Sequence, residues 1–216
     1  MLVYIFTFFI TNVISHVFMA YPPSRRNKYS EYYFKNDLVD YNLMAPLNTP
    51  GYSFPCKGYL NGPATAIINS DNINVQLEGS VFHNGGHCQF GVSYDDSTFV
   101  VLKTIQTNCL TGTGLNINVP LTNVSGNVTF FWTWINSIGN REYYMECADI
   151  FVNQPFQENI YGKELLVVNL PNYTIIPEFP LLTSYNGIDL LNNRNDIIWN
   201  RNLTTILTST STISCN

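Results

Sequence analysis

The pattern of apolar and polar positions along the chain predicts strands rather than helices. From Val75 onward, short runs rich in Val, Ile, Phe and Thr recur between clusters of Gly, Asn and Pro, as in sheet proteins. No stretch has convincing helical periodicity. The expected strands cover residues 74–78, 89–94, 98–103, 116–120, 127–135 and 142–152. Because one open sheet could not hide both of its faces, we expect an all-β fold, an antiparallel β-sandwich of immunoglobulin-like or fibronectin-like type with long loops.

The strand pattern is preceded by an apolar run within residues 1–15. The run is shorter than the roughly 20 apolar residues that span a bilayer, and small side chains precede the bond between Ser15 and His16. We therefore expect a signal peptide at 1–15, with an uncleaved anchor as the alternative because no Lys or Arg precedes the run. Residues 16–152 then form the sandwich, and 153–216 form a C-terminal extension of unknown role.

Charge is scarce and net negative in this chain. Charged residues make up 12% of the 216 residues, and 10 Lys and Arg against 15 Asp and Glu give a net charge of -5. Without a basic run beyond Arg25-Arg26, the sequence argues against a nucleic-acid partner. Asn, Ser, Thr and Tyr instead provide a neutral hydrogen-bonding surface that suits a sugar polymer, although genomic base composition can also enrich Asn and Tyr. The loop-like segment 21–55 contains many of these residues, and Tyr21 is one candidate for stacking on sugar rings.

Cysteines and glycosylation motifs both favour a secreted protein. None of the five cysteines has CxxC spacing, so disulfides are favoured over a zinc site, and Cys215 is the candidate for the one left over. Four Asn-x-Ser/Thr motifs fit N-glycosylation, which takes place in the secretory pathway. They begin at Asn123, Asn127, Asn172 and Asn202. We expect an extracellular protein with no membrane contact once the signal is removed.

The three histidines are the candidate metal ligands. Removal of the signal would make His16 the first residue, offering its α-amine and a ring nitrogen to one ion. A second imidazole would complete a planar set of three nitrogens, which favours Cu(II) over zinc. His83 and His87 have the i, i+4 spacing of a helical zinc site, but Gly85-Gly86 between them predicts a tight loop between strands. The alternative is that these are ordinary hydrogen-bonded turn histidines.

An aromatic-rich hairpin contains the other candidate residues. Two strands within residues 130–149 flank a turn at 137–140. Alternation along the second strand places Glu142 and Tyr144 on one face, so that a carboxylate and a phenol project side by side. The alternative is an ordinary amphipathic strand.

Several separated blocks together resemble the lytic polysaccharide monooxygenases, most closely the chitin-active fungal group called auxiliary activity family eleven. The blocks are a His at the predicted mature terminus, Phe54-Pro-Cys-Lys-Gly58, His83-Asn-Gly-Gly-His-Cys-Gln89 with Ser93-Tyr-Asp95, Trp132-Thr-Trp-Ile-Asn136, and Gly139-Asn-Arg-Glu-Tyr-Tyr-Met-Glu-Cys-Ala148. They follow the family's order from His16 to about Val152, and the residues from Asn153 onward carry no usable motif.

The resemblance implies a copper site of the histidine-brace type. His16 would supply its amine and a ring nitrogen, and His83 would supply the third nitrogen. Tyr144 matches the family's axial tyrosine, and Glu142 matches the acid that positions the oxygen species. His87 departs from the small residue usual there; it either tunes the pocket or faces water, and we favour the latter. The resemblance also implies disulfides Cys56–Cys147 and Cys88–Cys109, with Cys215 free for an intermolecular bond.

The function implied is a secreted, copper-dependent monooxygenase that oxidatively cleaves chitin or a related β-1,4-linked polysaccharide. Its partners would be the insoluble polymer, an external electron donor, and peroxide or dioxygen. The alternatives are a noncatalytic copper-binding or cell-wall-binding sandwich protein and an anchored structural glycoprotein without metal.

Overall fold

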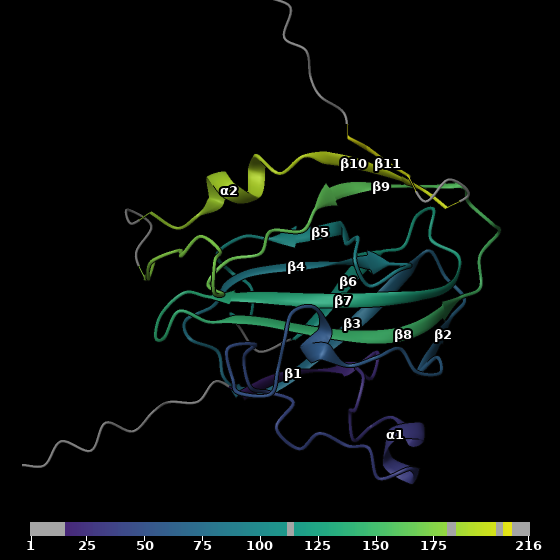
Figure 1. Ribbon diagram of the computed structural model, residues 1–216, viewed down its shortest axis with the longest axis horizontal. Helices are drawn as coiled ribbons and strands as arrows, with labels where there is room; N and C mark the ends of the chain where they lie inside the picture. Colours follow the sequence, from purple (N-terminus) through teal and green to yellow (C-terminus); the bar gives the residue numbers. More distant parts are fainter. Residues whose placement is uncertain (1–15, 112–114, 181–184, 202–204, 209–216) are drawn as a thin grey trace, which may run out of the picture.

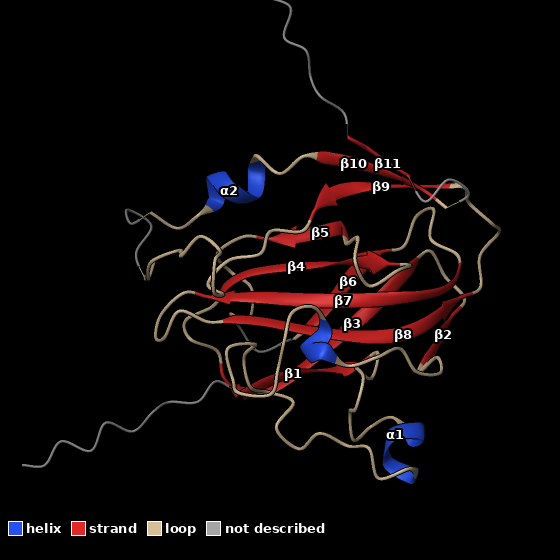
Figure 2. Cartoon of the chain, viewed as in Figure 1, coloured by secondary structure: helices blue, strands red, loops and turns tan. Residues whose placement is uncertain are grey.

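Two β-sheets packed face to face form the body of the protein. The computed structural model describes residues 16–111, 115–180, 185–201 and 205–208, and His16 and 205–208 by their backbone alone. An eight-stranded sheet runs across the view in Figure 1, and the strands of a three-stranded sheet cross it on the far side. Figure 2 shows that the helices in these ranges are short, with two of them at the periphery of the strands. The predicted all-β sandwich is confirmed.

The small sheet contains β1 (His16–Tyr21), β3 (Asn72–Val81) and β6 (Asn116–Pro120), in the order β1-β3-β6. The large sheet has the order β11-β10-β9-β5-β4-β7-β8-β2. Its strands are β2 (Ala66–Ile68), β4 (Gly86–Ser93), β5 (Val100–Ile105), β7 (Gly126–Asn136), β8 (Tyr143–Val152), β9 (Asn159–Glu164), β10 (Asp196–Asn200) and β11 (Thr205–Thr208). Its pairs are antiparallel except β2 with β8, which is a parallel departure from the expected pattern. The helical segments are α1 (Glu31–Lys35), η1 (Cys56–Gly58) and α2 (Ile188–Asn192).

The apolar core lies between the sheets, and a second cluster covers the outer face of the large sheet. On β3, Ile73, Val75 and Leu77 alternate with more exposed residues, as in a strand with one buried face. The strands β7 and β8 are instead buried on both faces, because a further apolar cluster containing Phe131 and Met145 packs outside them. This double burial explains the nearly continuous aromatic run in the sequence of β7.

Two disulfides tie loops to this sheet. Cys56 is bonded to Cys147 of β8, and Cys88 of β4 is bonded to Cys109. Both predicted pairings are confirmed, and such bonds are typical of proteins that fold in an oxidising compartment. Cys215 lies outside the described residues.

The residues after 152 add strands to the same large sheet. β9 pairs with β5, and β10 pairs with β9, so this part of the chain extends the sheet on the side away from β8. The predicted signal peptide, residues 1–15, lies outside the described residues. Within the described ranges, none of the helices has the length and apolar character required to cross a membrane.

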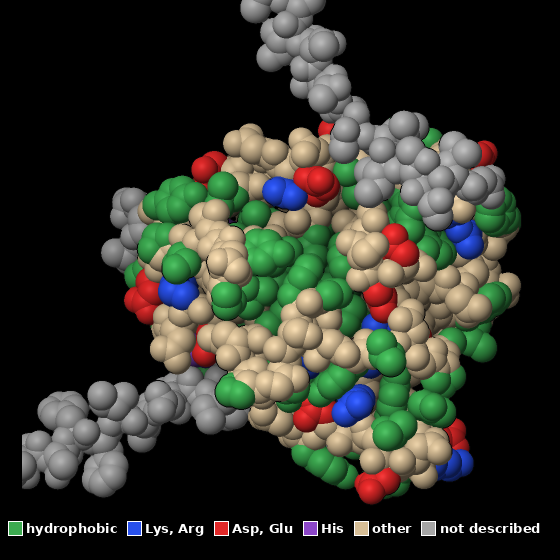
Figure 3. Space-filling model, in the orientation of Figure 1, with side chains coloured by type: hydrophobic (Ala, Val, Ile, Leu, Met, Phe, Trp, Pro, Cys, Tyr) green, Lys and Arg blue, Asp and Glu red, His purple; other side chains and the backbone are tan. Residues whose placement is uncertain are grey.

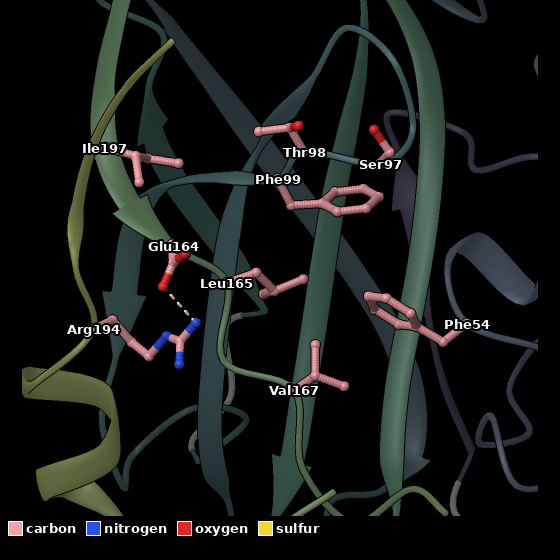
Figure 4. A pocket seen from close by; sticks show the side chains of 9 residues that line it. All are labelled: Phe54, Ser97, Thr98, Phe99, Glu164, Leu165, Val167, Arg194 and Ile197. Carbon is pink, nitrogen blue, oxygen red and sulfur yellow. Dashed lines mark hydrogen bonds and ion pairs between the residues drawn. The ribbon is translucent and has the colours of Figure 1, made fainter. Parts of the chain in front are cut away.

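The outer face of the large sheet is hollowed. Figure 3 shows apolar side chains gathered in the middle of this face. A hollow of about 210 Å³ lies there, with Phe54, Phe99 and Leu165 along it. Figure 4 shows the ion pair of Arg194 and Glu164 at its side, with 2.8 Å between Nη2 and Oε2. None of the predicted site residues lines this hollow.

Candidate metal centre

His83 lies in a tight turn between β3 and β4, as the Gly-Gly sequence predicts. His83 and Asn84 both have positive φ, 45° and 56°, a left-handed conformation that is uncommon for residues other than glycine. Gly86 is required for packing, because a Cβ there would lie 2.0 Å from the carbonyl oxygen of Ile135 on β7. The turn is therefore pressed against the end of β7, and the imidazole leaves it in a fixed direction.

The imidazole of His83 is buried beside Glu142 and Trp134. Its side chain is 7% exposed, and Nε2 has no hydrogen-bond partner among the described residues. The nearest carboxylate oxygen recorded is Oε2 of Glu142, 4.0 Å away, beyond hydrogen-bonding distance. The ring centroid lies 5.9 Å from that of Trp134, which packs beside it. Since buried polar atoms are normally paired, this nitrogen is suited to an additional ligand.

Glu142 and Tyr144 lie on the same face of the hairpin, the face that is next to His83. The Tyr144 hydroxyl donates to Glu142 Oε2 at 2.5 Å, and both side chains are buried. The backbone N–H of Glu142 donates to Oδ1 of Asn136, which fixes the residue just before β8. Tyr143 points to the other face, where its hydroxyl donates to the carbonyl of Leu166. The expected alternation along this strand is therefore present.

The start of β1 lies beside the strand that leads into His83. The backbone of His16 pairs with Val81, two residues before His83. Three residues into β1, the N–H of Met19 donates to Oε2 of Glu146, a buried carboxylate on β8. Burial raises the pKa of this carboxyl. β1 is thus anchored to both sheets, whereas the side chain of His16 lies outside what the structure describes.

His87 has a different role from the one expected, because it does not face water. It is 1% exposed, and both ring nitrogens are paired. Nδ1 accepts the N–H of Thr107 at 3.1 Å, so Nε2 carries the proton and donates to the carbonyl of Asn186 at 2.7 Å. The ring of Phe179 stacks on it at 4.7 Å. Burial lowers the pKa of His87, which favours the neutral ring. His87 therefore joins the sandwich to the C-terminal residues and has no nitrogen left for a metal.

The C-terminal residues also reach the hairpin turn beside His83, which the sequence did not indicate. Phe179 N–H donates to the carbonyl of Ser137, and Ser137 Oγ donates back to the carbonyl of Phe179. Glu178 accepts the N–H of Gly139 at 2.6 Å. Most of these contacts use backbone atoms, which carry no sequence signal. Tyr21, the named candidate for sugar stacking, is half-buried and packs against the core.

The chemistry of His83 fits a copper site. Its Nε2 would share the metal with donors from residues whose side chains the structure does not describe. Imidazole nitrogen is a favoured ligand of copper, and Nε2 of His83 is a buried example that lacks a partner in the described part of the chain. Among the side chains with described positions, no three His, Cys, Asp or Glu residues are grouped to hold a metal. Any complete nitrogen set in this place therefore needs donors from beyond those side chains, such as His16.

Comparison with known proteins defines the family. The chain is 38% identical over 167 residues to an AA11 family lytic polysaccharide monooxygenase A of Aspergillus fumigatus, covering 73% of this chain and 76% of that protein. It is 32% identical over 131 residues to an AA11 enzyme of Aspergillus oryzae, covering 50% of this chain and 31% of the relative. An AA11 enzyme B of Aspergillus fumigatus is 33% identical over 132 residues, covering 50% of this chain and 32% of that protein.

Among solved structures, a Jonesia denitrificans lytic polysaccharide monooxygenase aligns with 64% of this chain and 100% of its own, with a TM-score of 0.45 and 15% identity. No family model matches the chain. The chain belongs to the AA11 family of lytic polysaccharide monooxygenases, which are copper-dependent enzymes. Family membership implies a copper cofactor and a polysaccharide substrate.

Proposed function

We propose that the mature protein begins at His16 and binds one copper ion through the His16 amine, the His16 ring and Nε2 of His83. Tyr144 would complete the residues that hold the metal, and Glu142 would act from outside the set of atoms that touch it. The observation that carries the proposal is the buried Nε2 of His83, which no described residue pairs and which lies 4.0 Å from the Glu142 carboxylate.

The backbone of β1 supports the participation of His16. Because His16 pairs with Val81, its Cα lies next to the strand that ends two residues before His83. Cleavage before His16 would free an amine at this end of β1. An amine with a pKa of roughly 8 gives up its proton readily to a bound metal.

The chain's own groups would orient the reactants. Copper, when bound, supplies the one-electron chemistry with dioxygen or peroxide that an unactivated C–H bond beside a glycosidic oxygen requires. Glu142 Oε2 is held by the Tyr144 hydroxyl and faces the His83 ring, so the carboxyl can hold a proton or accept a hydrogen bond there. Trp134 packs against both His83 and Tyr144 and excludes water from the inner side of the site.

Chitin or a related β-1,4-linked polysaccharide is the proposed substrate. The low proportion of charged residues suits an uncharged polymer. The segment of residues 29–41 also exposes aromatic rings, which have apolar faces and polar edges suited to sugars. They are Tyr29, Tyr32, Phe34 and Tyr41.

The test is incubation of copper-loaded mature protein with chitin, a reductant and trace peroxide, followed by mass spectrometry. Oxidised chito-oligosaccharides are the expected products. Bound copper without oxidised products from chitin or from other β-1,4-linked polymers would contradict the enzyme assignment and favour a copper-binding wall protein.

We also propose secretion and glycosylation, with Asn172 as the best-placed acceptor. Asn172 lies in a turn and both it and Thr174 are exposed, whereas the hydroxyl of Thr129 in the Asn127 motif is buried against Arg25. Asn202 lies outside the described residues. Mass spectrometry of the secreted protein should find a glycan at Asn172 and a free amino terminus at His16, and a secreted chain still carrying residues 1–15 would contradict the maturation step.

A further inference from the structure

The C-terminal segment of residues 176–180 lies along the turn that flanks His83. We call this segment the strap. It is joined to the hairpin turn by the paired hydrogen bonds between Phe179 and Ser137. The ring of Phe179 is buried against His87, and Ile176 is fully buried. The strap is therefore packed in place from both of its ends, and Glu178 lies between these two anchors.

Glu178 binds the backbone N–H of Gly139, a residue of the hairpin turn. Its Oε1 accepts the N–H of Gly139 at 2.6 Å. The other side of the same residue is held by Arg141, whose Nη2 donates to the Gly139 carbonyl at 2.9 Å. Nη1 of Arg141 also donates to the carbonyl of Pro177 at 3.3 Å, which links the guanidinium to the strap itself. Both polar groups of the Gly139 backbone are thus fixed by charged side chains.

Gly139 in turn abuts the imidazole of His83. A Cβ added to Gly139 would lie 2.8 Å from Nδ1 of His83 and 3.1 Å from its Cε1, so the backbone leaves no room between turn and ring. The neighbouring residue adds a direct bond, because the N–H of Ile138 donates to the carbonyl of His83 at 3.2 Å. With Trp134 beside the ring, the turn limits how far the imidazole can rotate.

We propose that Glu178 is a positioning residue for the copper site, acting through Gly139 on the orientation of the His83 ring. This inference rests on the proposed function, since it assumes that Nε2 of His83 binds copper. Rotation of the ring would turn the lone pair of Nε2 away from the metal. Groups that orient a ligating histidine typically contribute about 10–100-fold to metal affinity. The strap thus gives part of the C-terminal extension a task at the site.

The test compares Cu(II)-loaded mature protein with its Glu178→Ala and Glu178→Gln variants by electron paramagnetic resonance and by copper titration. Glu178→Ala removes the acceptor and is expected to change the copper hyperfine coupling and weaken binding about 10-fold. Glu178→Gln retains an acceptor oxygen and is expected to restore the spectrum of the wild type. Hydrogen exchange of the Gly139 amide in copper-free protein should quicken in the Ala variant alone.

Glu158→Gln is the matched control, because Glu158 also lies after residue 152 and accepts from Asn200 at a distance of 3.0 Å. It is expected to leave the copper spectrum unchanged. An unchanged spectrum and affinity in Glu178→Ala, or an equal change in Glu158→Gln, would overturn the proposal. If His83→Ala binds copper as tightly as the wild type, the proposed copper site itself is wrong, and that result is separate from the Glu178 comparison.

Discussion

His83 and His87 are four residues apart, and both imidazoles are buried. His83 lies in the turn before β4, and His87 lies at the start of that strand. The two rings differ in the hydrogen bonds that their nitrogens make. Nε2 of His83 has no partner among the described residues, whereas both nitrogens of His87 are hydrogen-bonded to backbone atoms. A buried nitrogen that is satisfied by the protein serves the fold, and one left unsatisfied is free for a ligand. Counting partners separates the two histidines where their spacing in the sequence does not.

Copper affinity is expected to separate the two histidines most strongly. His83→Ala removes one of three proposed nitrogens and should weaken binding by at least about 100-fold, the upper end of the range for loss of an outer partner. His87→Ala removes no ligand and should stay within a few-fold of the wild type. Isothermal titration of the mature, folded variants measures both. Equal losses in the two variants, or loss in His87→Ala alone, would exchange the roles assigned here.

At the proposed copper site beside His83, the rate of substrate oxidation should respond to a change that leaves copper binding intact. Glu142→Gln keeps the shape of the side chain but loses the charge, and we expect the rate of chitin oxidation to fall about 100-fold while copper stays bound. The rate is measured by mass spectrometry of oxidised products, with metal content determined on the same samples. Because Glu142 is proposed to lie outside the metal's ligands, equal loss of copper and activity would contradict that placement.

In the absence of copper, we expect His87→Ala to lower the free energy of unfolding more than His83→Ala does, the reverse of their order in copper affinity. His87→Ala leaves the N–H of Thr107 and the carbonyl of Asn186 without their partner, and is expected to lower the free energy of unfolding by about 2 kcal/mol. His83→Ala removes no such bond from Nε2 and should cost less. Chemical denaturation of the copper-free variants gives both values. A larger loss in His83→Ala would mean that His83, and not His87, supports the fold.

The pH dependence of stability gives the smallest expected effect. Unfolded His87 takes up a proton near its ordinary pKa of 6.5, and the buried ring, whose pKa is lowered, does so only at lower pH. Between these values the unfolded chain binds more protons, so this contribution is complete above about pH 6.5 and is lost as the pH falls. The difference in unfolding free energy between copper-free wild type and His87→Ala should therefore shrink from pH 7 to pH 5. A constant or growing difference would contradict a neutral His87.

The central strands were predictable because their side chains alternate or run apolar over long stretches. β7 and β8 match the expected strands closely, and the hairpin put Glu142 and Tyr144 on one face. β2 has three residues, too few to show a period, and β9 and β10 are short runs among Asn-rich stretches. β2 and β9 are defined by the strands they pair with, β8 for β2 and β5 and β10 for β9, and these partners are distant in the sequence.

The candidate site was predictable to the extent that residue type carries its chemistry. His83, Glu142 and Tyr144 could be named because a ligand, an acid and a phenol are recognisable side chains. The partners of His87 could not be foreseen, because the atoms involved are the N–H of Thr107 and the carbonyl of Asn186. Every residue except proline has these groups, so only folding identifies which ones meet the ring.

The central claim is that a free amine at His16 and Nε2 of His83 bind the same copper ion. The most direct measurement is electron paramagnetic resonance of stoichiometric Cu(II) added to chain beginning at His16 and to chain that retains Ser15 before it. We expect a spectrum with coupling to three nitrogens for the trimmed chain and its loss when Ser15 remains. Identical spectra from the two chains would contradict the claim.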